Sequence, residues 1–230
     1  MIRNNQGFFV AQGLKEELFL MKAFINQQEK QINNYIRDID DCVETAEAEE
    51  WYETSDGQAE KVLVNIKHIE GVSEDDYDFK AIFTEVMPLY QRQAMLVAVW
   101  GRLECKLDNI AHHLATIRNI KIKSKSKGLS DFMHLINEIE RLGVKIRDSK
   151  ECSLAVDTLN EEVREIRNAW VHNGGRATKK RVRIIVKSSQ HLRFESEKIN
   201  ISKEYMLFVI GQMSKISKKI LSEFIAKKIS

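Results

Sequence analysis

The feature that most constrains the fold of this chain is its near lack of proline, since Pro88 is the only one in 230 residues. Proline removes a backbone donor and breaks helix interiors, so this chain can form long uninterrupted helices. Glycine is also sparse, which disfavours an all-β sandwich with its many tight turns. We therefore expect a mainly α protein, large enough for one domain or for a domain with an extension.

Apolar residues spaced alternately four and three apart predict a long N-terminal helix over residues 9–52. The seam of this helix comprises Leu14, Leu18, Met21, Ile25, Ile32, Tyr35 and Ile39, with Gln28 as a polar interruption. Such a seam can pair with a second copy or fold back on a neighbouring helix, and the sequence leaves both open. A turn at Ser55-Asp56-Gly57 and a shorter helix over residues 58–70 follow. The polar segment 71–77 then separates an N-terminal helical extension, residues 1–78, from a second domain, residues 79–230.

Four further helices are expected in the second domain, over residues 79–121, 130–143 and 150–172 and from Ser202 onward. Ser130 and Ser202 are the expected N-caps of the helices that follow them. Alternating charged and apolar residues over 181–187, and more weakly over 191–195 and 198–201, predict a small β-hairpin or three-stranded ribbon. The predicted fold is a helical bundle with a long N-terminal helix and a small β-hairpin before the last helix.

Charge is distributed unevenly along the chain. The net charge of +2 combines 11 Lys/Arg and 21 Asp/Glu in residues 1–117 with 25 Lys/Arg and 13 Asp/Glu in residues 118–230. The basic half is the half expected to bind a polyanion, unless the two halves simply attract each other.

Cysteine usage and hydropathy indicate the compartment. Cys42, Cys105 and Cys152 have no paired spacing, which favours reduced thiols in a cytoplasmic protein over a disulfide framework or a zinc site. No run of about 18 apolar residues and no secretory leader is visible, so we expect no membrane partner.

The segment Arg167-Asn-Ala-Trp-Val-His172 lies at the end of a predicted helix, directly before Asn173-Gly174-Gly175. Asn168 and His172 are four residues apart and share one helix face, and the long side chain of Arg167 reaches toward the same cleft. These groups suit phosphodiester cleavage in RNA, because histidine serves as base or acid near neutral pH and arginine holds phosphate. The sequence shows no cluster of metal-ligand type, so we expect neither a metal nor another cofactor.

This segment, R-polar-x-x-x-H before a final hairpin and helix, resembles the signature of the HEPN domains. The helix that contains Tyr90-Gln-Arg-Gln-Ala-Met-Leu96 and Leu103-Glu104 is similar to the family's earlier core helix, and the resemblance covers about residues 79–228. It implies a homodimer whose two R-x4-H segments form one composite cleft, which in active members is a metal-independent endoribonuclease. Many members are toxins or antiviral effectors, so an antitoxin or defence-system protein is a possible partner. Other members have lost activity and bind only RNA or a partner protein.

The resemblance makes Arg167, Asn168 and His172 the expected catalytic residues and Glu104 a possible acid that tunes the site. The residues expected to bind the RNA substrate follow the motif: Asn173, Arg176, Lys179, Lys180 and Arg181.

Structural interpretations of the same residues stay open. His172 can complement the helix dipole, Asn173 can cap the helix, and the basic run can be a solvated surface. Trp170 is expected in the core or in a dimer interface. The adjacent His112 and His113 point about 100° apart on a helix and cannot chelate as a pair four residues apart does. A purely structural coiled-coil protein is the weakest of the readings.

Overall fold

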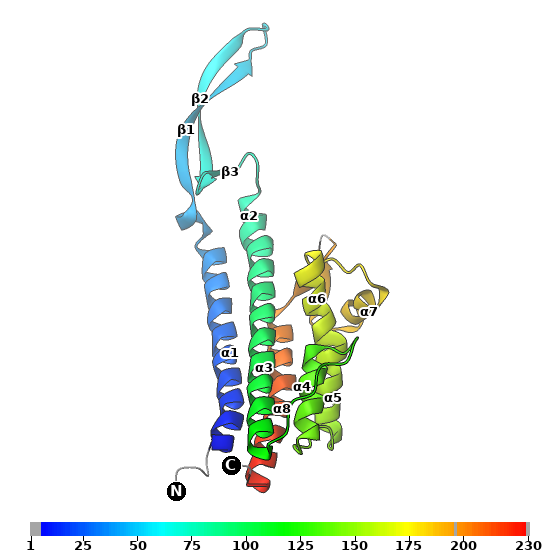
Figure 1. Ribbon diagram of the computed structural model, residues 1–230. Coiled ribbons are helices and arrows are strands. Elements are labelled where there is room, and N and C mark those ends of the chain that lie inside the picture. The colour runs from blue at the N-terminus through cyan, green and yellow to red at the C-terminus, as the bar shows by residue number, and fades with distance from the viewer. Residues whose placement is uncertain (1–5, 196, 229–230) are drawn as a thin grey trace. The chain divides into compact units, whose positions relative to one another are not determined.

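The computed structural model describes residues 6–195 and 197–228, and it is mainly helical with a long N-terminal helix and a β-hairpin before the last helix, as predicted (Figure 1). In chain order the helices and strands are α1 (Gln6–Arg37), β1 (Glu44–Glu53), β2 (Ala59–Ile69), β3 (Val72–Ser73), α2 (Phe79–Ala81), α3 (Met87–Arg118), α4 (Asp131–Arg141), α5 (Lys150–Thr158), α6 (Arg164–Asn173), α7 (Lys180–Ser188), β4 (Leu192–Glu195), β5 (Lys198–Ile201) and α8 (Lys203–Ala226). A 3-10 turn spans Ile39–Cys42, and π-helical turns span Ile82–Val86 and Leu159–Val163.

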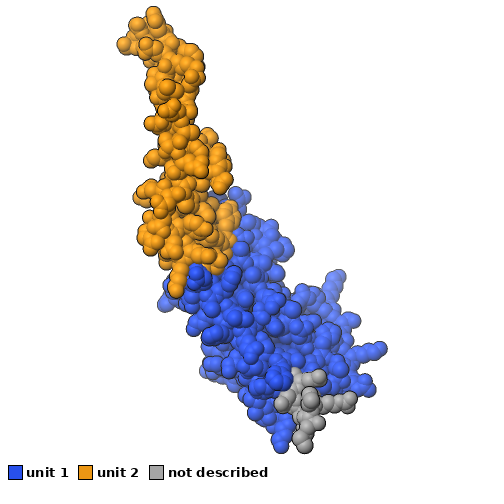
Figure 2. Space-filling model, turned by 90° about the vertical axis from the view of Figure 1, so that its left-hand side faces the viewer, with its two compact units in different colours: residues 1–27, 92–230 blue, residues 28–91 orange. Residues whose placement is uncertain are grey.

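The chain divides into two compact units, which Figure 2 colours separately. Unit 1 consists of residues 1–27 and 92–230, and unit 2 consists of residues 28–91. The boundary expected between residues 78 and 79 remains a prediction.

Within unit 1, the N-terminal part of α1 folds back on α3. The seam residues Leu14, Leu18 and Ile25 are almost completely buried. Beside them, the buried Glu17 carboxylate accepts hydrogen bonds from Arg102 at 2.7 Å (Nε) and 3.0 Å (Nη2). The Arg102 hydrogen bond lowers the pKa of Glu17, which keeps the carboxylate charged at this helix contact.

Two other helices of unit 1, α4 and α8, begin where the sequence places their caps. The Ser130 hydroxyl accepts a hydrogen bond from the Met133 amide at 3.2 Å, and the Ser202 hydroxyl accepts one from the Tyr205 amide at 3.1 Å. Helix α8 then buries the apolar stripe that its spacing predicts: Val209, Met213, Ile216, Ile220 and Phe224. Both N-cap predictions are confirmed.

Two π-helical turns interrupt predicted helices. Pro88 is the second residue of α3, which begins directly after the turn Ile82–Val86. A proline has no amide hydrogen and crowds the carbonyl four residues earlier, and a π turn is one of the ways a helix accommodates such a break. The second turn, Leu159–Val163, joins α5 to α6 within the helix predicted over residues 150–172.

In unit 2, two helix predictions are wrong. The N-terminal helix ends at Arg37 and not at residue 52. In place of the helix predicted over residues 58–70, Ala59–Ile69 form strand β2, which pairs with β1 in an antiparallel ribbon. A helix over residues 38–53 would bring like charges such as Glu50 and Glu53 together one turn apart and would place these glutamates at a helix C-terminus, and both are unfavourable. In the ribbon, Glu49 pairs with Lys61 instead.

The ribbon β1–β2 has chemically different faces. One face carries the directly opposed pairs Ala46–Ile66, Ala48–Val64 and Glu50–Val62, and the other carries Glu47–Asn65, Glu49–Leu63 and Trp51–Lys61. Residues on both faces are exposed or half-buried. Ribbon stability therefore rests mainly on backbone pairing and on cross-strand contacts at the surface.

Between α6 and α8, the strand predicted over residues 181–187 is also wrong, because Lys180–Ser188 form helix α7. The segment fits both periods, since Val182 and Val186 are four residues apart and also belong to an alternating pattern. The structure buries Val182 and Val186 and leaves Ile184 58% exposed, which is the pattern of a helix. The following β4–β5 hairpin is confirmed and pairs Leu192 with Ile201.

Candidate functional site

The R-x4-H segment lies on α6, which ends at two left-handed glycines as the sequence predicts. Gly174 (φ 58°) caps the helix and Gly175 has φ 83°. A Cβ on Gly175 would lie 2.5 Å from the ring of the buried Trp170, so glycine is required there for both conformation and space. Trp170 thus belongs to the core and fixes the loop that leaves the site.

Asn168 and His172 line one pocket of about 250 Å³. His172 is exposed and Asn168 is half-buried, so the imidazole is accessible from solvent. Arg167 does not line this pocket, but its Nη1 donates a hydrogen bond to Asn168 Oδ1 at 2.9 Å. The structure therefore connects Arg167 to the pocket through Asn168.

Glu104 on α3 lies close enough to Arg167 for the positive charge of the arginine to affect the pKa of the Glu104 carboxyl. Burial raises the pKa of the Glu104 carboxyl, while a hydrogen bond from Trp100 and the positive charge of Arg167 oppose this rise. The charge of Arg167 thus reaches the Glu104 carboxyl, and the role of Glu104 as an acid that tunes the site remains a prediction. The Arg167 Nε is buried without a hydrogen-bond partner among the described residues, which leaves one donor of this guanidinium unused.

The basic residues predicted to bind substrate separate into two groups. Asn173, Arg176 and Lys179 line the pocket of His172. Lys180 and Arg181 do not line it. Arg181 instead pairs with the carboxylate of Glu161 and donates to the Glu161 carbonyl at 3.2 Å.

Sequence reasoning missed Glu165, Thr178 and Val182 in the lining of this pocket. Glu165 is buried and lies 2.9 Å from Arg164 Nη2 and 3.4 Å from Lys179 Nζ. Its position three residues before Asn168 and seven before His172 places it on the same helix face, and this spacing was the available signal. Thr178 lies in the loop after α6 and Val182 lies on α7, and the sequence held no comparable signal for either.

Within residues 6–195 and 197–228, no group of three or more His, Cys, Asp or Glu side chains is placed to hold a metal ion. His112 is exposed, whereas His113 is half-buried and stacks on Phe224 with ring centroids 6.5 Å apart, so the two histidines face different environments as expected. Among the same residues, none of the helices has both the length and the hydropathy needed to cross a bilayer.

Comparisons with known proteins give no match to this chain, whether with family models, curated proteins or solved structures. The function is therefore argued from the geometry and charge of the site itself.

Proposed function

We propose that this chain is a metal-independent endoribonuclease of HEPN type that acts in the cytoplasm as a homodimer, in a toxin–antitoxin or antiviral defence role. The observation that carries the proposal is one pocket in which an accessible imidazole, His172, lies with Asn168, Arg176 and Lys179. An imidazole that can act as general base or acid, beside fixed cations, suits attack on a phosphodiester.

The reaction follows from these groups. His172 takes the proton of a ribose 2′-hydroxyl while its oxygen attacks phosphorus, and the bond from phosphorus to the 5′-oxygen breaks. The leaving oxygen needs a proton, which His172 of a second copy supplies. The products are a 2′,3′-cyclic phosphate and a 5′-hydroxyl.

The other motif residues act on the phosphate. Arg167 neutralises the charge that develops on the phosphorane, and Asn168 orients that guanidinium through the hydrogen bond at 2.9 Å. Glu104 is the proposed acid that tunes the site, because the charge of Arg167 acts on its carboxyl group.

The test is cleavage of a labelled mixed-sequence RNA in EDTA by wild type, His172→Ala and Arg167→Ala. Removal of a general base or of a fixed phosphate cation is expected to slow cleavage at least about 100-fold. His112→Ala is the matched control, because His112 is an exposed helix histidine that lies 3.5 Å from Asp108 and does not line the pocket. Equal cleavage by all four proteins, with folding intact by circular dichroism, would reject the proposal.

A second candidate is a catalytically inactive module that binds RNA or a partner protein. The half-buried position of Arg167, with its hydrogen bond to Asn168 and its proximity to Glu104, favours this reading, because such contacts also suit a structural arginine. RNA binding without cleavage, undiminished in His172→Ala, is the result that would select it.

A further inference from the structure

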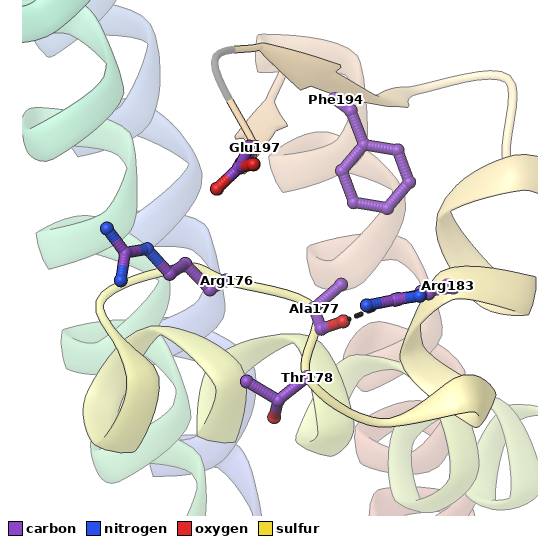
Figure 3. Close-up of a pocket in the computed structure, with 6 residues that line it drawn as sticks. All are labelled: Arg176, Ala177, Thr178, Arg183, Phe194 and Glu197. Carbon is purple, nitrogen blue, oxygen red and sulfur yellow. Dashed lines mark hydrogen bonds between the residues drawn. The ribbon is translucent and has the colours of Figure 1, made fainter.

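A second pocket, of about 350 Å³, adjoins the pocket of His172 and shares Arg176 and Thr178 with it. The other side chains that line it come from the loop after α6, from α7 and from the β4–β5 hairpin: Ala177, Arg183, Phe194 and Glu197 (Figure 3). A polymer that occupies the first pocket can therefore continue into the second along Arg176.

Phe194 forms one wall because of its place in the hairpin. It lies directly opposite Ile199 and on the same face as Leu192, and both of these are buried. Phe194 ends this apolar stripe, beyond the core, and remains 40% exposed. In Figure 3 the ring extends toward the Ala177 loop and Arg183, and it lines the pocket with them.

The polar groups of this pocket have few partners in the protein. Arg183 Nε donates to the Ala177 carbonyl at 2.9 Å, which fixes the side chain at the pocket wall. Among the described residues, the structure gives neither Arg176 nor Arg183 a carboxylate partner, and it gives the carboxylate of Glu197 no ion pair. The pocket thus combines an aromatic ring, two guanidinium groups and one acceptor-only carboxylate.

We infer that this second pocket is a base-binding subsite for single-stranded RNA, with guanine as the preferred base; this rests on the proposed function. Phe194 stacks on the base, Arg176 and Arg183 hold the flanking phosphates, and Glu197 accepts hydrogen bonds from the base edge.

The preference for guanine follows from the carboxylate. An ionised glutamate only accepts hydrogen bonds, and guanine offers it two adjacent donors, N1–H and the 2-amino group. Adenine and cytosine offer one amino group each beside an acceptor nitrogen. Uracil places a carbonyl oxygen on each side of its single N–H, which repels the carboxylate.

The test measures binding of fluorescein-labelled RNA octamers to the full chain carrying His172→Ala, by fluorescence anisotropy at fixed salt. The two probes are an octamer of uridines and the same octamer with one central guanosine. The guanosine probe is expected to bind about tenfold more tightly, and Phe194→Leu, which keeps apolar bulk but loses the aromatic face, removes most of this gain. Glu197→Gln abolishes the difference between the probes with the overall affinity retained.

Two controls keep the result specific. Phe19→Ala removes an aromatic side chain that is 73% exposed on α1 and does not line the pocket, and it is expected to change neither affinity. Glutamine at position 197 meets the same positive φ of 66° as glutamate, so this substitution isolates the charge. Equal binding of both probes by the parent, or a guanosine preference unchanged in Phe194→Leu and Glu197→Gln, overturns the inference.

The same variants without His172→Ala separate this inference from the proposed function. If wild type cleaves RNA and Glu197→Gln cleaves at the same positions with the same rates, the subsite is refuted and the endoribonuclease stands. If wild type does not cleave while the guanosine preference depends on Phe194 and Glu197, the subsite stands and the endoribonuclease is refuted.

Discussion

Units 1 and 2 of this molecule differ in both packing and charge. Unit 1 buries mainly apolar helix faces and carries 31 Lys/Arg against 17 Asp/Glu, whereas residues 28–91 carry 5 against 17. In unit 2 the ribbon β1–β2 leaves large side chains such as Trp51 and Leu63 exposed. The comparison teaches that the excess of basic residues lies in unit 1, a sharper division than the sequence halves gave, and that the two units differ in how they are stabilised.

The largest expected difference concerns apolar burial. Leu107→Ala on α3, where the side chain is fully buried, is expected to lower the free energy of unfolding by about 2–5 kcal/mol. Leu63→Ala on β2, where the residue is 67% exposed, is expected to change it by less than about 0.5 kcal/mol. Urea unfolding followed by circular dichroism measures both. Equal losses would show that the ribbon contributes a core of its own.

The next difference concerns carboxylates and pH. Hydrogen bonds, first from Lys227 and then from the Lys145 amide and Lys219, lower the pKa of Glu223 on α8 from 4.5 to about 2. Because this pKa is depressed in the folded state, the stabilisation is complete above about pH 4.5 and is lost as the pH falls toward 2. It amounts to the order of 2–3 kcal/mol at neutral pH.

Glu223→Gln is expected to lower stability at pH 7 and to flatten the loss of stability between pH 4.5 and 2. Glu49→Gln in the ribbon is the matched variant, since its side chain is 56% exposed and pairs with Lys61 at the surface. An exposed pair contributes less than about 1 kcal/mol, so this variant is expected to follow the wild-type curve. Thermal unfolding from pH 2 to 7 measures the stability of all three proteins. Coincident curves would contradict the role given to Glu223.

A smaller effect is expected on the salt dependence of RNA binding. In the His172→Ala background, Lys179→Ala removes one cation from the site pocket, and the slope of log affinity against log salt should decrease by about one unit or less. Lys61→Ala in the ribbon should leave the slope unchanged. Anisotropy titrations between low and moderate salt measure both slopes, and an equal change in the two variants would remove the distinction between the units.

The smallest effect is expected from shortening the ribbon. Ala48 and Val64 lie directly opposite each other, so residues 49–63 can be replaced by Asn-Gly with the remaining register retained. Unit 1 should keep its amide protection in hydrogen exchange, and RNA cleavage should stay within about twofold of wild type, because surface changes rarely shift stability far. Loss of protection in α5, α6 or α8 would mean that the ribbon stabilises unit 1.

Local chemistry explains which elements the sequence predicts correctly. The hydroxyls of Ser130 and Ser202 cap helices by accepting a hydrogen bond from the backbone amide three residues later. Gly174 ends α6 because glycine readily adopts the left-handed conformation. In unit 2 the helix prediction is wrong because residues 44–53 are rich in alanine and glutamate, which favour helices. The pairing with β2 that overrides this preference lies outside the segment. The alternation of Val62, Val64 and Ile66, just after the Asp56-Gly57 turn, was the signal for a hairpin.

The sequence predicts those residues of the site that lie on one face of α6. Spacing alone places Asn168 with His172 and would also have included Glu165. Arg176 and Lys179 reach the same pocket only because Gly175 packs against Trp170 and redirects the chain, which is a tertiary contact. Phe194 and Arg183 border the adjoining pocket because a hairpin and a helix meet there, and no periodicity within either segment predicts that meeting.

The π-helical turn at Leu159–Val163 has a consequence for how this chain tolerates change. A π turn holds one residue more than an α turn, so it shifts the angular phase of every later residue on the helix by about 100° relative to α5. The directions in which the Arg167 and His172 side chains point therefore depend on the number of residues that precede them in the helix, and not only on which amino acids stand at these positions. Substitutions within residues 159–163 can preserve that phase, but loss of a single residue there would turn the motif away from its pocket while leaving every motif residue in place.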